Sequence, residues 1–192
     1  RQGLQRFIEL PFGRRVIEEK FDLLATLSDR ETLRRHPQGS LAEAYLQFVE
    51  SENLSADGLV EASESESDSY DNAWLQRYGL RLRDQHDLWH TTTGYGRDEL
   101  GELCLLAFTY AQTRNRGIGF IVLVGMLKMR KALGNGVFKA VRDGFRDGRR
   151  AAWLPGQNWE ALLQRPLADV RAELNIGKPQ TYQLIRQQAV AV

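Results

Sequence analysis

The sequence predicts an all-α fold in which about seven to nine helices form one bundle. Apolar residues recur every three or four positions through most of the chain, as they do on one face of a helix. No segment of convincing length alternates apolar and polar residues, which is the pattern of a half-buried strand. A length of 192 residues with 42% hydrophobic residues is enough for one core, so we assign residues 1–192 to a single helical domain.

The first predicted helices follow from spacing and capping patterns. Residues 12–27 carry apolar side chains at helical spacing and predict one amphipathic helix. Asp29 is suited to cap a short helix that ends at His36, because the residue before Pro37 disfavours helical geometry. Residues 40–43, Ser-Leu-Ala-Glu, form a capping-box pattern and predict the start of another helix.

Residues 54–70 are predicted to form a mobile, acidic, serine-rich loop. Within this segment, residues 61–69 contain mainly serine and acidic residues and no large apolar residue. Such a composition cannot bury a face, so a solvated loop is a simpler interpretation than an acidic binding site.

The remaining chain is predicted to be helical up to residue 176, followed by a C-terminal extension over residues 177–192. One helix begins near Asp71, and a second begins near Leu80 and ends at Gly94. Further helices are expected over residues 98–113, 117–133, 137–146, 157–164 and 167–174. The apolar run 117–127 is shorter than the roughly 20 residues of a membrane-spanning helix, so it predicts a buried or interfacial helix.

Charge and cysteine content narrow the class of function. The chain has 26 basic and 25 acidic residues, and this net charge of +1 favours no nucleic-acid partner. Its single cysteine, Cys104, lies between two leucines, which predicts a core residue and, without a disulfide framework, a reducing compartment. No signal peptide opens the sequence, and we expect the start at Arg1 to reflect a processed product.

Residues 83–102 concentrate the metal-binding chemistry of the chain. His86 and His90 are four residues apart, so they project from the same face of a helix, and Asp87 borders that face. The following Thr-Thr-Thr-Gly-Tyr-Gly segment lets the chain reverse before a second helix that carries Glu102. Two imidazoles and one carboxylate leave coordination positions open, which is typical of a catalytic metal site.

These residues also have ordinary explanations. A pair of histidines four apart on a helix is common without a metal. Asp98 and Glu99 suit a helix N-terminus, where the helix dipole favours acids, whereas Glu102 lies one turn further in. His36, beside Pro37, is interpreted as a loop or helix-end residue.

The motif resembles that of a known family. His86-Asp87-Leu-Trp-His90, then eleven residues and Glu102, resembles the metal motif of the coenzyme Q biosynthesis protein four family. Residues 37–41, 76–78 and 171–176 look like further family signatures, so the resemblance covers about residues 30–176. The acidic loop, and a sequence that shows no transit segment, favour a bacterial member.

By this resemblance, the metal ligands and catalytic residues are His86, Asp87, His90 and Glu102. The implied metal is zinc, with iron or another divalent metal as the alternative. The resemblance further implies an all-helical protein of ubiquinone biosynthesis that is cytoplasmic and peripherally associated with the inner membrane, on the matrix side in a eukaryote. The implied partners are a prenylated quinone precursor or other isoprenoid lipid, other quinone-biosynthetic proteins, the membrane surface and a second copy in a homodimer.

A prenylated ligand requires an apolar slot for its tail. The helices after the motif supply candidate walls of a lipid groove, with ordinary core packing as the alternative: Phe108, Phe120, Leu123 and Met126. Residues 128–150 hold eight basic and two acidic residues, a local net charge of +6. This segment suits anionic lipid headgroups, a substrate carboxylate or a partner protein, and equally a solvated face.

The resemblance implies two alternative functions, and the His86-Asp87 doublet suggests a third. The first is a metal-dependent decarboxylase, a carbon–carbon lyase that replaces the ring carboxyl of a polyprenylated hydroxybenzoate-type precursor by hydroxyl, with Asp87 as a fourth ligand or a base beside the metal. The second is a non-catalytic scaffold that binds prenyl lipid and presents quinone precursors to other enzymes. The third, a His-Asp phosphohydrolase, rests on the His86-Asp87 doublet and finds only His36 and Asp143 as further ligands.

Overall fold

The computed structural model describes residues 2–51 and 73–190. All regular secondary structure in these two segments is helical, which confirms the predicted all-α class. The one strand-like pairing within the described residues is an isolated bridge between Ser40 and Pro166. The described helices outnumber the prediction, because several of them are short. The predicted acidic loop over residues 54–70 lies outside the described residues.

The chain divides into two compact units. The first comprises Arg1–Thr91 and Pro155–Val170, and the second comprises Thr92–Leu154 and Arg171–Val192. The α8 helix (His86–Thr93) and the α13 helix (Leu167–Glu173) each run from one unit into the other. The assignment of residues 1–192 to a single domain stays a prediction.

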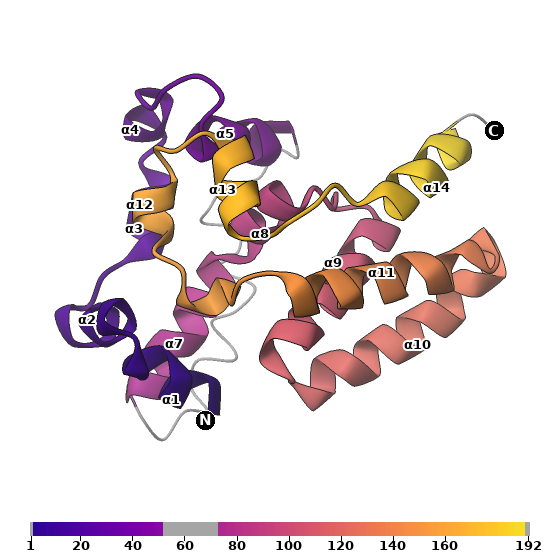
Figure 1. The fold of residues 1–192 in the computed structure, drawn as a ribbon, viewed down its shortest axis with the longest axis horizontal. Helices are drawn as coiled ribbons and strands as arrows, with labels where there is room; N and C mark the ends of the chain where they lie inside the picture. The colour runs from indigo at the N-terminus through magenta and orange to yellow at the C-terminus, as the bar shows by residue number, and fades with distance from the viewer. Residues whose placement is uncertain (1, 52–72, 191–192) are drawn as a thin grey trace. The chain divides into compact units, whose positions relative to one another are not determined.

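The first unit is built mainly from short helices. They are α1 (Gln2–Glu9), α2 (Pro11–Glu19), α3 (Leu23–Ser28), α4 (Arg30–Arg34), α5 (Leu41–Ser51), α7 (Ala73–Asp84) and α12 (Trp159–Leu162), and the 3-10 turn η1 (Leu154–Gly156) lies at its edge. In Figure 1, α12 of the late chain lies beside α3 of the early chain. The N–H of Leu41 donates to the carbonyl of Arg165, which also joins early and late segments.

The prediction of one helix over residues 12–27 is wrong. Lys20 adopts a left-handed conformation (φ 58°) that ends α2, and α3 begins three residues later, at Leu23. Asp22 caps α3, because its side chain accepts a hydrogen bond from the N–H of Ala25 at 3.0 Å. The apolar spacing continues across this break, so the periodicity alone did not reveal it.

Two predicted helix starts are confirmed. The Asp29 side chain accepts from the N–H of Thr32 at 3.1 Å and caps α4. At α5, Ser40 Oγ accepts from the N–H of Glu43 at 3.2 Å. The Glu43 carboxylate reaches back to the N–H of Gly39 at 2.6 Å, one residue earlier than in the usual capping box. The N–H of Ser40 is already bonded to the carbonyl of Pro37.

A buried polar cluster anchors the junction of α7 and α8. The Gln85 side chain is fully buried, and its Oε1 accepts from the indole N–H groups of Trp89 (3.2 Å) and Trp159 (2.9 Å). Arg81, one turn earlier, forms two hydrogen bonds of 2.8 Å with the Glu160 carboxylate. Because both contacts join α7–α8 to α12, they hold the start of the histidine helix within the first unit.

The second unit contains longer helices. They are α9 (Glu99–Thr113), α10 (Arg116–Leu133), α11 (Gly136–Arg150) and α14 (Gln180–Val190), and α14 lies in the predicted C-terminal extension. Figure 1 shows α10 and α11 running side by side, and α9 packs against both. Cys104 of α9 is completely buried, and this burial raises the pKa of its thiol to about 12. This agrees with a core role, because the thiol stays protonated at neutral pH.

The α10 helix differs from its neighbours because most of its large apolar side chains are exposed. Val122 is its buried residue, whereas Phe120 is 67% exposed. Within the described part of the chain, no helix combines the length and the apolar character that crossing a bilayer requires.

Candidate metal centre

Helix α8 presents its two histidines on one face, as the four-residue spacing predicts. The ring centroids of His86 and His90 are 4.6 Å apart, with the rings nearly edge to face. The helix runs from His86, directly after the anchored Gln85, to Thr93, and the φ of 79° at Gly94 confirms the predicted stop. The predicted start near Leu80 is wrong, because α7 continues through that residue to Asp84.

The two histidines have different surroundings. His90 is buried and stacks on the ring of Phe48 in α5, with centroids 5.3 Å apart. His86 is partly exposed, and its Nδ1 lies 3.5 Å from Oδ1 of the buried Asp87. Packing therefore limits the rotamers of His90, while a neighbouring carboxylate is placed to orient His86.

Glu102 is held in the first turn of α9. Asp98 caps this helix by accepting from the N–H of Gly101 at 3.0 Å, and its carbonyl accepts from the N–H of Glu102 at 2.9 Å. The Glu102 carboxylate lies 3.7 Å from Nε of Arg97. The turn before α9 thus fixes both the backbone and the immediate charge environment of Glu102.

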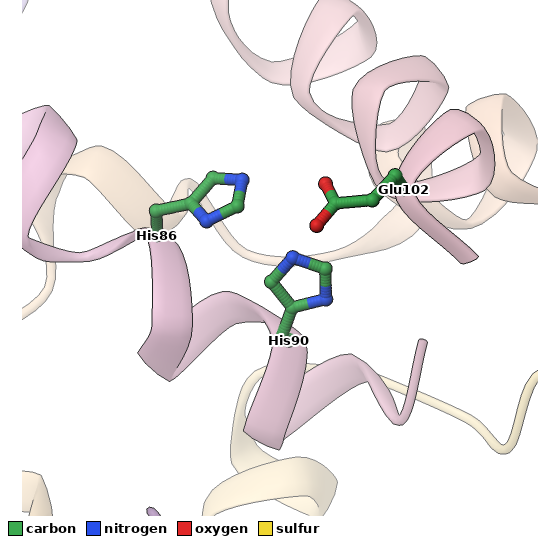
Figure 2. Close-up of side chains that lie close together, drawn as sticks. All are labelled: His86, His90 and Glu102. Atoms are coloured by element: carbon green, nitrogen blue, oxygen red, sulfur yellow. The ribbon is translucent and has the colours of Figure 1, made fainter. Parts of the chain in front are cut away.

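Three of the four predicted ligands form a compact group. Among the described residues, His86, His90 and Glu102 each offer a ligand atom, and these atoms all lie within 4.8 Å of one another. Figure 2 shows the two imidazoles and the carboxylate pointing toward a common space. Asp87 is not a member of this group, so its assignment as a ligand stays a prediction.

This donor set fits a divalent transition metal. Neutral imidazole and carboxylate ligands suit zinc and iron, whereas calcium and magnesium prefer oxygen ligands alone. Three protein ligands leave one or more positions open for substrate or water, as in catalytic sites. Asp87 lies beside His86 and outside this group, where a carboxylate could orient a histidine that binds a metal.

Tyr182 of α14 supports the turn that precedes Glu102, a role that sequence analysis missed. Its hydroxyl donates to the carboxylate of Asp98 and accepts from the N–H of Gly96 at 3.0 Å. Burial, followed by the bond to Asp98, raises the pKa of Tyr182 to about 12, so the hydroxyl remains a donor at neutral pH. Tyr182 lies 84 residues from Asp98, and no local pattern links the two positions.

The Tyr182→Phe substitution is expected to destabilise the second unit. It removes the hydroxyl that joins α14 to Asp98 and Gly96 but keeps the buried ring. Because one partner is a carboxylate, we expect a loss of about 1–2 kcal/mol in the free energy of unfolding, measured by urea denaturation. Tyr110→Phe, which removes a hydroxyl outside this cluster, is the control. Equal unfolding midpoints for the two variants would contradict the role of Tyr182.

The predicted lipid-groove residues have different environments. Phe108 of α9 is 1% exposed and packs in the core, whereas Phe120 and Leu123 lie on the exposed side of α10. Met126 is half-buried on the same helix. Their assignment as the walls of one groove stays a prediction.

Known proteins are similar to this chain over a region that includes all residues of the candidate site. A family model described as "Coenzyme Q (ubiquinone) biosynthesis protein Coq4" matches residues 3–180. The mitochondrial ubiquinone biosynthesis protein COQ4 of Podospora anserina is 30% identical over 88% of this chain and 54% of its own length. The mitochondrial COQ4 homologue of Rattus norvegicus is 28% identical over 88% of this chain and 62% of its own length. The chain therefore spans little more than half the length of these relatives.

A solved structure shares the fold. A candidate ubiquinone biosynthesis protein from Nostoc punctiforme matches with a TM-score of 0.63 and 19% identity, over 90% of this chain and 79% of that one. The bacterial origin of the present chain stays a prediction. The family model covers most of the chain, including the histidine helix, Glu102 and the turn between them. The chain belongs to the Coq4 family of coenzyme Q (ubiquinone) biosynthesis proteins.

Proposed function

We propose that this chain is a metal-dependent enzyme of ubiquinone biosynthesis that acts on a polyprenylated hydroxybenzoate-type precursor. The observation that carries the proposal is the grouping of His86, His90 and Glu102 within 4.8 Å in a member of this family. Two histidines and one carboxylate with open positions suit a metal that binds a substrate head group directly.

The proposed reaction replaces the ring carboxyl by hydroxyl. The bond between the ring and the carboxyl carbon breaks, the carboxyl leaves as carbon dioxide, and a bond forms between the ring carbon and oxygen. With dioxygen as oxidant, one oxygen atom enters the ring, and the other leaves as water after taking up two electrons and two protons from a reductant. A bound iron would supply the redox chemistry, whereas zinc would act only as a Lewis acid.

The residues of the chain have distinct proposed roles. His86, His90 and Glu102 would hold the metal, and the packing of His90 against Phe48 keeps one imidazole pre-oriented. Asp87 would orient His86, which lies 3.5 Å away, and would accept a proton from the bound substrate or water. Arg97 limits the movement of the Glu102 carboxylate.

The test is metal-dependent turnover by purified protein. Protein purified without oxygen would be stripped with a chelator, reloaded separately with zinc or ferrous iron, and supplied with a short-prenyl 4-hydroxybenzoate, dioxygen and a reductant. We expect hydroxylated product and carbon dioxide with one metal only, and label from ¹⁸O₂ in the new hydroxyl. Full activity of metal-free protein would overturn the proposal.

The same experiment addresses the scaffold function. A protein that binds metal and prenyl lipid but never converts the substrate, with either metal, would support a non-catalytic presenter of quinone precursors. The Glu102→Gln variant serves as the background control, because it keeps the shape of the side chain and removes the charged ligand.

We further propose that the chain works at the inner-membrane surface with other quinone-biosynthetic proteins, and that it forms a homodimer. The names of the relatives describe mitochondrial ubiquinone biosynthesis proteins, which supports the first part of this proposal. The proposed substrate supports the membrane location, because a polyprenyl tail partitions into the bilayer.

A further inference from the structure

Helix α10 presents one continuous apolar surface to its surroundings. Phe120, Leu123 and Leu127 are 67%, 50% and 51% exposed. With Ile121 and Val124, which are exposed to a similar degree, they form what we call the α10 face. Large apolar side chains clustered in this way mark a surface that binds another apolar surface.

The opposite side of α10 is occupied by its own protein. Val122 is buried, and α10 packs against both α9 and α11. The backbone at Gly119 approaches the Tyr110 ring so closely that an added Cβ would lie 2.8 Å from it. The helix therefore cannot turn its apolar side inward without losing these contacts, and the α10 face stays available to a partner.

The charges around the α10 face indicate which partner it fits. Exposed cations lie at both ends of the helix, Arg116 at its start and Lys128 and Lys131 at its end, and α10 contains no acidic residue. At helical spacing, Arg116, Phe120, Leu127 and Lys131 share one side of the helix. An apolar centre between cationic ends matches a bilayer surface, where acyl chains meet anionic headgroups.

The same charges disfavour a second copy on this face. A two-fold axis through the α10 face would pair α10 with itself. In an antiparallel pair, Arg116 of one copy would meet the Lys128–Lys131 end of the other, and in a parallel pair each cationic end would meet its equivalent. Either arrangement places like charges together beside a desolvated surface, which is costly.

We propose that the α10 face docks on membranes with anionic headgroups, with the helix axis parallel to the bilayer surface. The apolar side chains enter the boundary between headgroups and acyl chains, and the cations at both ends bind lipid phosphates. The α9 helix packs against α10 and carries Glu102, so docking of α10 would also bring α9 close to the membrane surface. The inference rests on the proposed function in one respect, because it specifies the surface by which the chain would work at the membrane.

The test is vesicle flotation with the purified chain of residues 1–192. Vesicles of phosphatidylcholine mixed with phosphatidylglycerol would be compared with vesicles of phosphatidylcholine alone. We expect wild-type protein to float with the anionic vesicles and to bind at least about tenfold more weakly to the neutral ones, with salt reducing the difference. The double variant Phe120→Ser/Leu127→Ser should lose at least about tenfold in binding to anionic vesicles.

A matched control is Leu184→Ser, because Leu184 is 59% exposed on α14, outside the α10 face. It should float like wild type, and circular dichroism should show all variants folded. The inference is overturned if the double variant binds anionic vesicles as wild type does. It is also overturned if lipid-free wild type is a dimer that the double variant converts to monomer, since the face would then be a protein interface. Metal content is measured in parallel, so a failure of the metal proposal is recognised separately.

Discussion

Replacing Glu102 by glutamine, or His90 by alanine, is expected to abolish tight metal binding. In wild type we expect about one divalent ion per chain, because three ligand atoms converge within 4.8 Å. Loss of an outer carboxylate beside a ligand typically weakens metal affinity by about 10–100-fold, so loss of a ligand itself should weaken it by more than about 100-fold. Metal analysis after dialysis, and titration of chelator-treated protein, measure both quantities.

The variants are chosen so that folding and metal binding can be separated. His90 is buried against Phe48, so alanine there also leaves a cavity, whereas Glu102→Gln preserves side-chain volume. His36→Ala is the control, because it removes the one histidine outside the group. If Glu102→Gln binds metal as tightly as His36→Ala, Glu102 is not a ligand.

The Asp87→Asn substitution is expected to cause an intermediate loss of metal affinity. Its carboxylate lies beside His86 Nδ1 but outside the group of converging ligand atoms. Asp87→Asn should therefore weaken metal binding by about 10–100-fold, less than the ligand variants do. An effect as large as that of Glu102→Gln would instead make Asp87 a direct ligand, as the family resemblance implies.

The sequence predicts those features of the site that depend on residues close together in the chain. The four-residue spacing of His86 and His90 determines that they share a helix face, and Gly94 determines where that helix ends. The sequence favours Asp98 as an acid at a helix N-terminus, and Asp98 does cap α9. Such features depend on residues a few positions apart, so they can be recognised without the fold.

The features that the sequence does not predict depend on contacts between segments far apart in the chain. Gln85 anchors α8 through Trp159, and Tyr182 supports Asp98, although each pair is more than seventy residues apart. The break at Lys20 was missed because the apolar spacing continues through it. The apolar run of α10 predicts a buried or interfacial helix, but it does not show which side is covered, because that depends on the neighbouring helices.

Close packing of α9 on α11 gives rise to the second large expected effect. Gly144 and Gly148 lie one turn apart on α11, where a Cβ added at either position would lie 2.6 Å from a carbonyl oxygen of α9, that of Cys104 or of Phe108. The two contacted carbonyls are themselves one turn apart. The two backbones therefore approach each other along a strip where only glycine fits, which a search for apolar periodicity does not detect.

Gly144→Val is accordingly expected to lower the free energy of unfolding by about 3 kcal/mol. The obstructing atom is a backbone oxygen that cannot rotate away, so α9 and α11 must separate and leave their buried side chains less well packed. For a chain of this length, the loss corresponds to a thermal midpoint about 6–12 °C lower, measured by circular dichroism. Lys139→Val, at an exposed position of the same helix, controls for the low helix propensity of valine. If both valine variants melt at the same temperature, the close approach does not stabilise the pair. If only Gly144→Val lowers the thermal midpoint, the close approach of Gly144 to the carbonyl of Cys104 stabilises the packing of α11 on α9, the helix that carries Glu102.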